Sequence, residues 1–353
     1  MKRVAIFIDN LNVGGIQKST VNMLKNLDTN KYLVDLYIYD TEQFYEIPKN
    51  VNLIKMAKPN KFLKFIPFNF AQKIYKPTFE NEYDVSIDFD SYQMHTAIGA
   101  LKCKSKKKVI WVHNDIQIKL KEEFKYRILY FFFKKKYKFF DEYVAVSKGA
   151  IDSFKEVIDY DDKIYTVIPN YIDTDEIKSK MEEESSLKVD KNTLNIVSVG
   201  RLCHQKGYDI MLEKIKELKE YRNDFHLYLI GDGPDKEMLI ELSDKYKIKD
   251  YITFLGNQKN PFKYLKEMDL FYLSSRYEGQ GMVILEAKSV GLDIIIPKHL
   301  EKYCPEVTGS NDVLEYLKNY TKKENKKEFN DLSSYNNEIT NKLNNLLEIN
   351  EGK

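Results

Sequence analysis

The stretch from 269 to 297 places two glutamates, Glu278 and Glu286, around a glycine-containing loop and the start of a predicted helix. Because Gly279 and Gly281 lack a Cβ, the loop backbone can approach a ligand closely. The exposed amide groups at the N-terminus of a helix favour an anion, usually a phosphate. A carboxylate beside a phosphate repels it, so we expect both glutamates to accept hydrogen bonds from sugar or ribose hydroxyl groups. The stretch therefore predicts a site for a nucleotide sugar.

Two cations follow the predicted strand 195–199, namely Arg201 and Lys206. An arginine fork and a lysine point charge at the end of one strand can together hold a diphosphate. The alternative is that both are solvated surface cations.

Gly231 and Gly233 follow the next predicted strand, 225–230, and form another turn at a strand end. They do not complete a dinucleotide-binding fingerprint, because Lys236 stands where the third glycine is needed. A dehydrogenase is therefore disfavoured.

The triplet Asp88-Phe89-Asp90 has the D-x-D spacing with which some glycosyltransferases of another fold bind a divalent cation. Such triplets arise by chance in a chain this acidic, and Arg201 and Lys206 already offer neutralising charge. We interpret the triplet as the end of a strand. The five histidines and three cysteines show no metal-ligand spacing, so we expect no metal and no cofactor.

Predicted strands alternate with predicted helices along the whole chain, which is typical of parallel α/β sheets. We expect two doubly wound, Rossmann-like domains facing a central cleft, with ligands at the carboxyl ends of the strands. The expected boundaries are 1–172 for an N-terminal, acceptor-side domain, 173–193 for a linker and 194–330 for a nucleotide-sugar-binding domain. A last helix, predicted at 335–349 within a C-terminal segment 331–353, is expected to pack back on the first domain.

Composition limits the classes of function. The chain has 353 residues, 43% of them hydrophobic and 31% charged, which is typical of a globular protein. A net charge of +2 argues against nucleic-acid binding, and three cysteines favour a reducing compartment. We expect no signal peptide and no membrane-spanning helix, and therefore a cytoplasmic protein.

Basic and aromatic residues are densely mixed between Lys119 and Phe140. One interpretation is a helix with a solvated lysine face and aromatic side chains in the core. A second, which we favour, is a peripheral contact with an anionic membrane, at its inner face. The segment 61–76 is of similar composition and would add to the same surface. Nucleic acid is a third and weaker alternative.

Six short motifs in order resemble the GT-B glycosyltransferases of family 4. They are Gly14-Gly15, Val146-Ser147, Pro169-Asn170, Gly200-Arg201 with Lys206-Gly207, Gly231-Asp232-Gly233-Pro234, and Glu278 with Glu286 eight positions later. The resemblance covers residues 1–297. It implies two Rossmann-like domains, a nucleotide-sugar donor, retention of anomeric configuration and no metal.

The resemblance also implies roles for individual residues. Arg201 and Lys206 would neutralise the donor diphosphate, Glu278 would hold the donor sugar, and Glu286 would hold the ribose. His113, at a strand end of the first half, would lie near the donor sugar. The implied catalytic residues are His113, Arg201, Lys206 and Glu278, and the implied donor-binding residues are Gly15, Arg201, Lys206, Gly231, Gly233, Glu278, Gly279, Gly281, Met282, Val283 and Glu286.

The expected function is transfer of a sugar from a UDP-type donor to a glycan or a polyprenyl-linked acceptor, as in capsule, exopolysaccharide or cell-wall assembly. Two alternatives are a UDP-sugar 2-epimerase on the same fold and a non-catalytic partner of another transferase. The chain departs from the family pattern after Pro297, where the usual glycine loop is missing and the first glycine is Gly309, and at Tyr171, where glycine is common.

Overall fold

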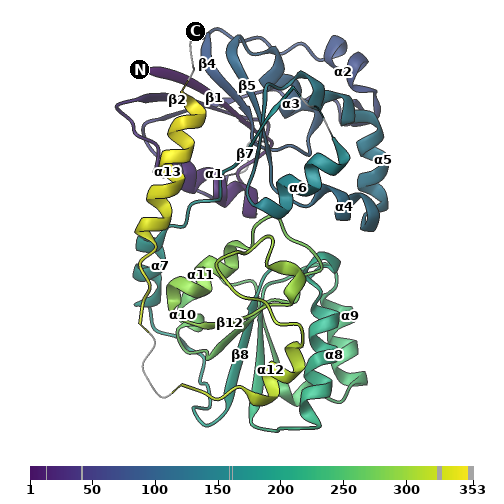
Figure 1. Cartoon of the computed structure of the whole chain (residues 1–353), viewed down its shortest axis with the longest axis vertical. Helices are drawn as coiled ribbons and strands as arrows, with labels where there is room; N and C mark the ends of the chain where they lie inside the picture. Colours follow the sequence, from purple (N-terminus) through teal and green to yellow (C-terminus); the bar gives the residue numbers. More distant parts are fainter. Residues whose placement is uncertain (13, 41–42, 159, 161, 324–327, 349–353) are drawn as a thin grey trace. The chain divides into compact units, whose positions relative to one another are not determined.

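A computed structural model describes residues 1–12, 14–40, 43–158, 160, 162–323 and 328–348. The chain forms two compact units (Figure 1). Unit 1 comprises Met1–Tyr171 and Tyr335–Lys353, and unit 2 comprises Ile172–Ser334. Each unit is described by itself.

Unit 1 contains a seven-stranded parallel sheet in the order β3-β2-β1-β4-β5-β6-β7. Apolar side chains dominate the central strands, as they must when both faces of a parallel sheet are covered. The strands are β1 (Lys2–Ile8), β2 (Tyr32–Ile38), β3 (Val51–Lys55), β4 (Tyr83–Asp88), β5 (Ser105–Val112), β6 (Glu142–Ala145) and β7 (Ile164–Val167).

Alternate residues of β1 enter two different cores, which shows that helices cover both faces of the sheet. Ile6 and Ile8 pack with helices α1 (Gly15–Lys25) and α13 (Ser333–Leu347). Phe7 packs on the other side with the remaining helices and 3-10 turns. These are η1 (Lys61–Phe65), α2 (Phe68–Ile74), α3 (Met94–Lys102), α4 (Ile116–Glu122), α5 (Phe124–Phe133), η2 (Lys134–Phe139) and α6 (Lys148–Val157).

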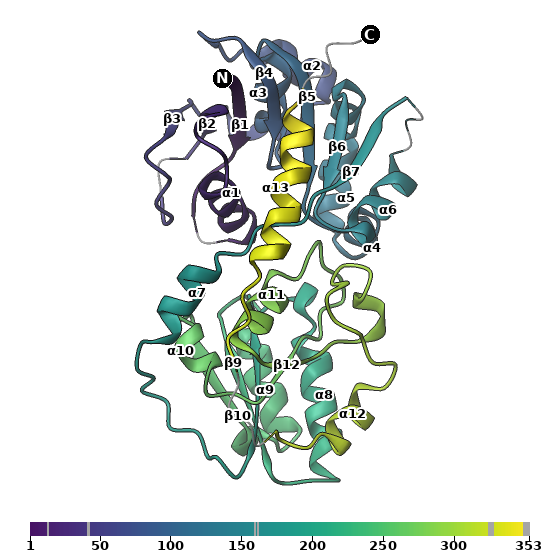
Figure 2. The same cartoon turned by 60° about the vertical axis from the view of Figure 1, so that its left-hand side comes forward.

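Helix α13, yellow in Figures 1 and 2, brings the end of the chain back to the beginning. Its apolar residues recur at helical spacing and are buried in the core that contains Ile6 and Ile8; they are Ile339, Leu343, Leu346 and Leu347. The last residue of the helix predicted at 335–349, Ile349, lies outside the described residues.

Unit 2 contains a five-stranded parallel sheet in the order β10-β9-β8-β11-β12. Its strands are β8 (Leu194–Val199), β9 (Phe225–Ile230), β10 (Ile252–Gly256), β11 (Leu270–Tyr272) and β12 (Asp293–Ile295). Its helices and 3-10 turns are α7 (Thr174–Met181), η3 (His204–Lys206), α8 (Tyr208–Lys219), α9 (Lys236–Lys245), η4 (Lys249–Tyr251), α10 (Phe262–Leu265), α11 (Met282–Val290), η5 (Lys298–Leu300) and α12 (Val313–Asn319).

Each sheet has one point at which the order of strands reverses. In unit 1 it lies between β1 and β4, and in unit 2 it lies between β8 and β11. Doubly wound sheets bind their ligands at this switch point, at the carboxyl ends of the strands. The prediction of two doubly wound α/β domains is confirmed. The segment 173–193, expected to be a linker, contains helix α7 and belongs to unit 2.

In the described ranges, no helix combines the length and the apolar composition that crossing a membrane requires.

Candidate functional site

An ion pair between Lys206 and Glu278 lies at the switch point of unit 2. Lys206 ends η3, after β8, and Glu278 lies in the loop between β11 and α11. Lys206 Nζ is 2.7 Å from Glu278 Oε1, and the two side chains are 18% and 6% exposed. The Ser275 hydroxyl donates to the same carboxylate oxygen at 2.5 Å. Two partners on one carboxylate oxygen therefore fix the orientation of Glu278.

The charge of Lys206 is maintained although the side chain is largely buried. Burial acts to lower the pKa of Lys206, but attraction by Glu278 and its hydrogen bond outweigh burial and raise the pKa above its usual value. Lys206 is therefore a fixed positive charge at a ligand-binding edge.

A second connection joins the same two loops. The guanidinium group of Arg276 donates to both carboxylate oxygens of Asp209, at 2.8 and 2.6 Å, and to the carbonyl oxygen of His204 at 2.8 Å. The hydrogen bond from Arg276 lowers the pKa of Asp209, against a smaller effect of burial. Arg276 and Asp209 were not predicted as site residues, because they lie 67 positions apart in the chain. Ser275 was also not predicted, although its partner Glu278 is only three positions away.

The glycines of the strand-end turns are required by the neighbouring backbone. A Cβ on Gly231, whose φ is 142°, would collide with the carbonyl oxygen of Gly200, and a Cβ on Gly233 would collide with that of Leu202. Gly207 has a left-handed φ of 63°, and a Cβ there would collide with the carbonyl oxygen of Ser274. These glycines let the turns after β8, β9 and β11 pack against one another.

Gly281 is the N-cap residue of α11 and directly precedes the helix. A Cβ on Gly281 would lie 2.9 Å from the sulfur of Cys304, which belongs to the segment that replaces the family's glycine loop after Pro297. Burial raises the pKa of Cys304 to about 12, so this thiol is neutral. The amide of Met282 donates to the carbonyl oxygen of Gln280 at 2.9 Å.

The remaining predicted donor residues of unit 2 differ in exposure. Gly279 and Glu286 are buried, and Val283 is half-buried at the start of α11. Arg201 is exposed, and it forms no ion pair with any residue of the described ranges. Its charge is therefore available to a ligand.

Two predicted residues, Gly15 and His113, lie in unit 1. Gly15 is the exposed first residue of α1, and a Cβ there would meet nothing within 4 Å, so packing does not require this glycine. His113 follows β5, with its ring centroid 4.6 Å from that of Phe89. Burial lowers the pKa of His113 to about 3, so the imidazole is neutral near pH 7.

Asp88 and Asp90 lie at and just after the end of β4, as expected for a strand end. Asp88 is fully buried, and Asp90 is 5% exposed. Burial raises the pKa of Asp88 to about 7 and that of Asp90 to about 6. Over the described ranges, no three His, Cys, Asp or Glu side chains are grouped so as to hold a metal ion.

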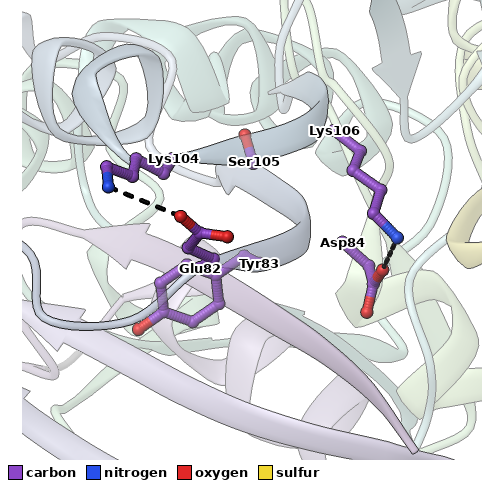
Figure 3. Close-up of a pocket in the computed structure, with 6 residues that line it drawn as sticks. All are labelled: Glu82, Tyr83, Asp84, Lys104, Ser105 and Lys106. Atoms are coloured by element: carbon purple, nitrogen blue, oxygen red, sulfur yellow. Dashed lines mark hydrogen bonds and ion pairs between the residues drawn. The ribbon is translucent and has the colours of Figure 1, made fainter.

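A hollow of about 480 Å³ opens elsewhere on unit 1 (Figure 3). It lies where β4 and β5 begin, so it is at the edge of the sheet opposite to the strand ends that bind ligands. Its charged side chains already pair with one another, with Lys104 3.4 Å from Glu82 and Lys106 2.9 Å from Asp84. We therefore do not assign it as the active site.

Family models match both units. A model described as Glycosyltransferase Family 4 matches residues 13–176, and one described as Glycosyl transferases group 1 matches residues 179–337. The chain belongs to family 4 of the GT-B glycosyltransferases. The predicted family is therefore confirmed, and this chain is a glycosyltransferase.

Relatives and solved structures agree with the family. The glycosyltransferase is 26% identical to N-acetylgalactosamine-N,N'-diacetylbacillosaminyl-diphospho-undecaprenol 4-alpha-N-acetylgalactosaminyltransferase of Campylobacter jejuni, over 85% of this chain and 81% of the relative. It is 24% identical to an uncharacterized glycosyltransferase of Haemophilus influenzae, over 84% and 80%.

Two crystal structures share the fold across the whole chain. One is S. aureus TarM in complex with UDP, with a TM-score of 0.67 and 11% identity, covering 99% of this chain and 100% of that one. The other is Anabaena HepE in complex with UDP-glucose, with a TM-score of 0.65 and 14% identity, covering 98% and 100%.

Proposed function

We propose that this glycosyltransferase transfers a sugar from a UDP-type donor to a glycan or polyprenyl-linked acceptor, with retention of anomeric configuration and without a metal ion. The observation that carries the proposal is the buried Lys206–Glu278 ion pair at the switch point of unit 2, beside the N-terminus of α11. This site combines a countercharge for a phosphate with a carboxylate for sugar hydroxyl groups.

The proposed chemistry depends on stabilising the leaving diphosphate. As the bond from the anomeric carbon to the diphosphate breaks, negative charge grows on the leaving oxygen. Lys206 and Arg201 face this charge, and pre-oriented charges in a partly buried site stabilise it more strongly than water does. Glu278 would bind hydroxyl groups of the donor sugar, and Glu286 those of the ribose. Neither glutamate needs to act as a base.

Relatives support the class of donor and acceptor. The name of the Campylobacter enzyme specifies an undecaprenol-linked acceptor and an α-linked product, and HepE was crystallised with UDP-glucose. Other relatives are named for lipopolysaccharide core and amylovoran biosynthesis. We therefore place the reaction in the assembly of a surface polysaccharide, of which a capsule is one case.

The proposal includes a contact with an anionic membrane, at its inner face. Exposed aromatic side chains of η1, α2, α5 and η2 form what we call the aromatic-basic surface: Phe62, Phe65, Phe70, Phe124, Phe131 and Phe139. The segments touch, because the ring of Phe65 lies 6.2 Å from that of Phe132 and the ring of Phe68 lies 5.7 Å from that of Phe139. Lysines stand beside the exposed rings, with Lys134 5.9 Å from the ring of Phe131. Rings that settle at a membrane interface and lysines that attract anionic headgroups suit such a contact.

The test incubates the protein with UDP-glucose, UDP-galactose and their N-acetylated counterparts, with and without EDTA. Release of UDP that EDTA does not affect, together with an α-linked product by NMR, would support the proposal. Failure to bind UDP in calorimetry and to release it would overturn the donor assignment. Inhibition by EDTA would overturn the metal-independent mechanism, and recovery of an epimerised UDP-sugar would identify the 2-epimerase instead.

A further inference from the structure

Unit 1 has a switch point of its own, and buried charged side chains gather there. Asp9 directly follows β1, while Asp88 ends the adjacent strand β4 and Asp90 follows it. His95 lies in the first turn of α3, the helix after β4. This is the edge at which a doubly wound sheet binds a ligand, and the donor site of unit 2 uses none of these residues.

Asp9 and His95 form a pair across this switch point. His95 Nε2 lies 2.8 Å from Asp9 Oδ1, and Lys58 Nζ lies 3.2 Å from the same oxygen. Only 12% of the Asp9 side chain and 10% of the His95 side chain are exposed. Burial acts to raise the pKa of Asp9, but the hydrogen bond and the charge of His95 outweigh it and lower the pKa to about 2. Asp9 therefore stays ionised although it is buried.

Further buried polar atoms near this switch point lack hydrogen-bond partners in the part of the chain that the structure describes. Within the described ranges, both carboxylate oxygens of Asp88 and the hydroxyl oxygen of Ser91 are buried without a hydrogen bond. The backbone around them is held by Lys136, which is fully buried and donates to the carbonyl oxygens of Ser91 at 2.6 Å and Gln93 at 3.0 Å. Asp90 interacts electrostatically with both Asp88 and Asp9. Buried polar groups are costly unless they are satisfied, so a ligand that supplies hydrogen bonds at this edge fits the cluster.

The charges of the cluster at the switch point of unit 1 indicate which class of ligand it can bind. The cluster combines three carboxylates with three basic groups: Asp9, Asp88 and Asp90 with Lys58, His95 and Lys136. Because the carboxylates balance the basic groups, the cluster has no excess positive charge with which to attract a phosphate. Hydrogen-bond acceptors that lie beside hydrogen-bond donors suit a hydroxyl group, because a hydroxyl group both donates and accepts a hydrogen bond. A neutral sugar therefore fits better than the phosphate of a lipid-linked acceptor.

We propose that Asp9, Asp90 and His95 bind hydroxyl groups of the acceptor sugar, with Lys136 as a positioning residue for the segment after β4. This inference rests on the proposed function, because it assigns the acceptor of that reaction. Asp9 holds the ring of His95, and Asp90, which follows β4, interacts electrostatically with both.

The test measures donor binding and acceptor use separately in the full chain. The probes are UDP, by calorimetry, and octyl glycosides of glucose, galactose and their N-acetylated forms as acceptors with the four UDP-sugars. The variants are Asp9→Asn, His95→Gln and Asp90→Asn. Asp152→Asn, on the exposed face of α6 in an ion pair with Lys148, is the matched control. Thermal unfolding checks that each variant is folded.

We expect the KM of the glycoside to rise about tenfold or more in the three variants, because each loses a buried hydrogen bond to a hydroxyl group. The Kd for UDP should stay within about twofold of the wild-type value, since unit 2 is unchanged. Folded variants with the wild-type KM would overturn the inference, and so would a wild-type protein that binds UDP but uses none of the glycosides. A wild-type protein that does not bind UDP would instead overturn the proposed function.

Discussion

Lys206 and Glu278 belong to loops that follow two adjacent strands, and they meet as an ion pair, with Nζ 2.7 Å from Oε1, where the strand order of unit 2 reverses. Glu278 raises the pKa of Lys206 and so keeps its ammonium group charged until a ligand enters. A diphosphate that arrives at Lys206 and a sugar that arrives at Glu278 would each replace part of this interaction.

Replacing Lys206 by Met should reduce the rate of transfer by about 100-fold or more, because the charge that faces the leaving group is lost. It should also lower the free energy of unfolding by about 3–5 kcal/mol, since Glu278 is left buried without its ion-pair partner. Donor turnover and urea unfolding measure the two effects. Lys214→Met, which removes an ion pair on the surface of α8, is the control and should change stability by about 1 kcal/mol or less. Wild-type turnover in the Lys206 variant would contradict the assignment.

Gly231→Ala should destabilise the protein far more than Gly256→Ala. Both glycines have a positive φ, of 142° and 65°, but a Cβ at 231 collides with the carbonyl oxygen of Gly200, whereas a Cβ at 256 meets nothing within 4 Å. We expect a loss of about 1–2 kcal/mol at 256 from backbone strain alone, and about 3–5 kcal/mol at 231, where overpacking is added. Thermal and urea unfolding of the two variants provide the comparison. Equal losses would show that the turns after β8 and β9 are not packed as described.

Replacing Phe124 and Phe131 by Ser should weaken binding to anionic liposomes without destabilising the fold. These side chains are 65% and 67% exposed, so their removal should change the free energy of unfolding by about 0.5 kcal/mol or less. Sedimentation with liposomes at low and high salt measures the binding, which should decrease as salt increases. Tyr221→Ser, at a 63% exposed site in unit 2, is the matched control. A wild-type protein that does not sediment at low salt would overturn the membrane proposal.

The contribution of His113 to the stability of the protein should be lost as the pH falls from about 6.5 towards 3. The pKa of His113 is lowered from 6.5 to about 3 in the folded state by burial. In this interval the unfolded chain binds a proton that the folded chain does not, so the contribution of His113 is fully present above pH 6.5 and is lost on acidification. Urea unfolding at several pH values measures the slope, which should be smaller in His113→Phe. An unchanged slope in that variant would refute the account of His113 as a buried, neutral imidazole.

The sequence was informative where local patterns determine local structure. Apolar runs predicted the strands, and a glycine loop before an apolar helix predicted the turn at Glu278 and helix α11. The ion pair of Lys206 with Glu278, separated by 72 positions, was not predicted. The resemblance to the family assigned both residues to the donor site, but spacing alone does not say which strands are neighbours.

Three features were missed for physical reasons. The pairs Arg276–Asp209 and Asp9–His95 depend on strand order, which no local pattern encodes. Helix α7 lies in the expected linker, and its signal is local: Asp173 caps it by accepting the amide of Glu176 at 3.0 Å. A search for helix caps would have found α7, whereas only the folded sheet reveals the two pairs.

Helix α13 has a consequence for the order of assembly. The segment that forms unit 2 leaves unit 1 after Tyr171 and returns to it at Tyr335, so unit 2 is an insertion within unit 1. The core of unit 1 needs Ile339 and Leu343 from beyond that insertion. The ribosome synthesises the N-terminal part of the chain first. Helix α13, which completes the core of unit 1, therefore emerges only after the whole of unit 2. Unit 2 can therefore fold during synthesis, whereas an apolar face of unit 1 stays uncovered until the segment that begins at Tyr335 has been synthesised.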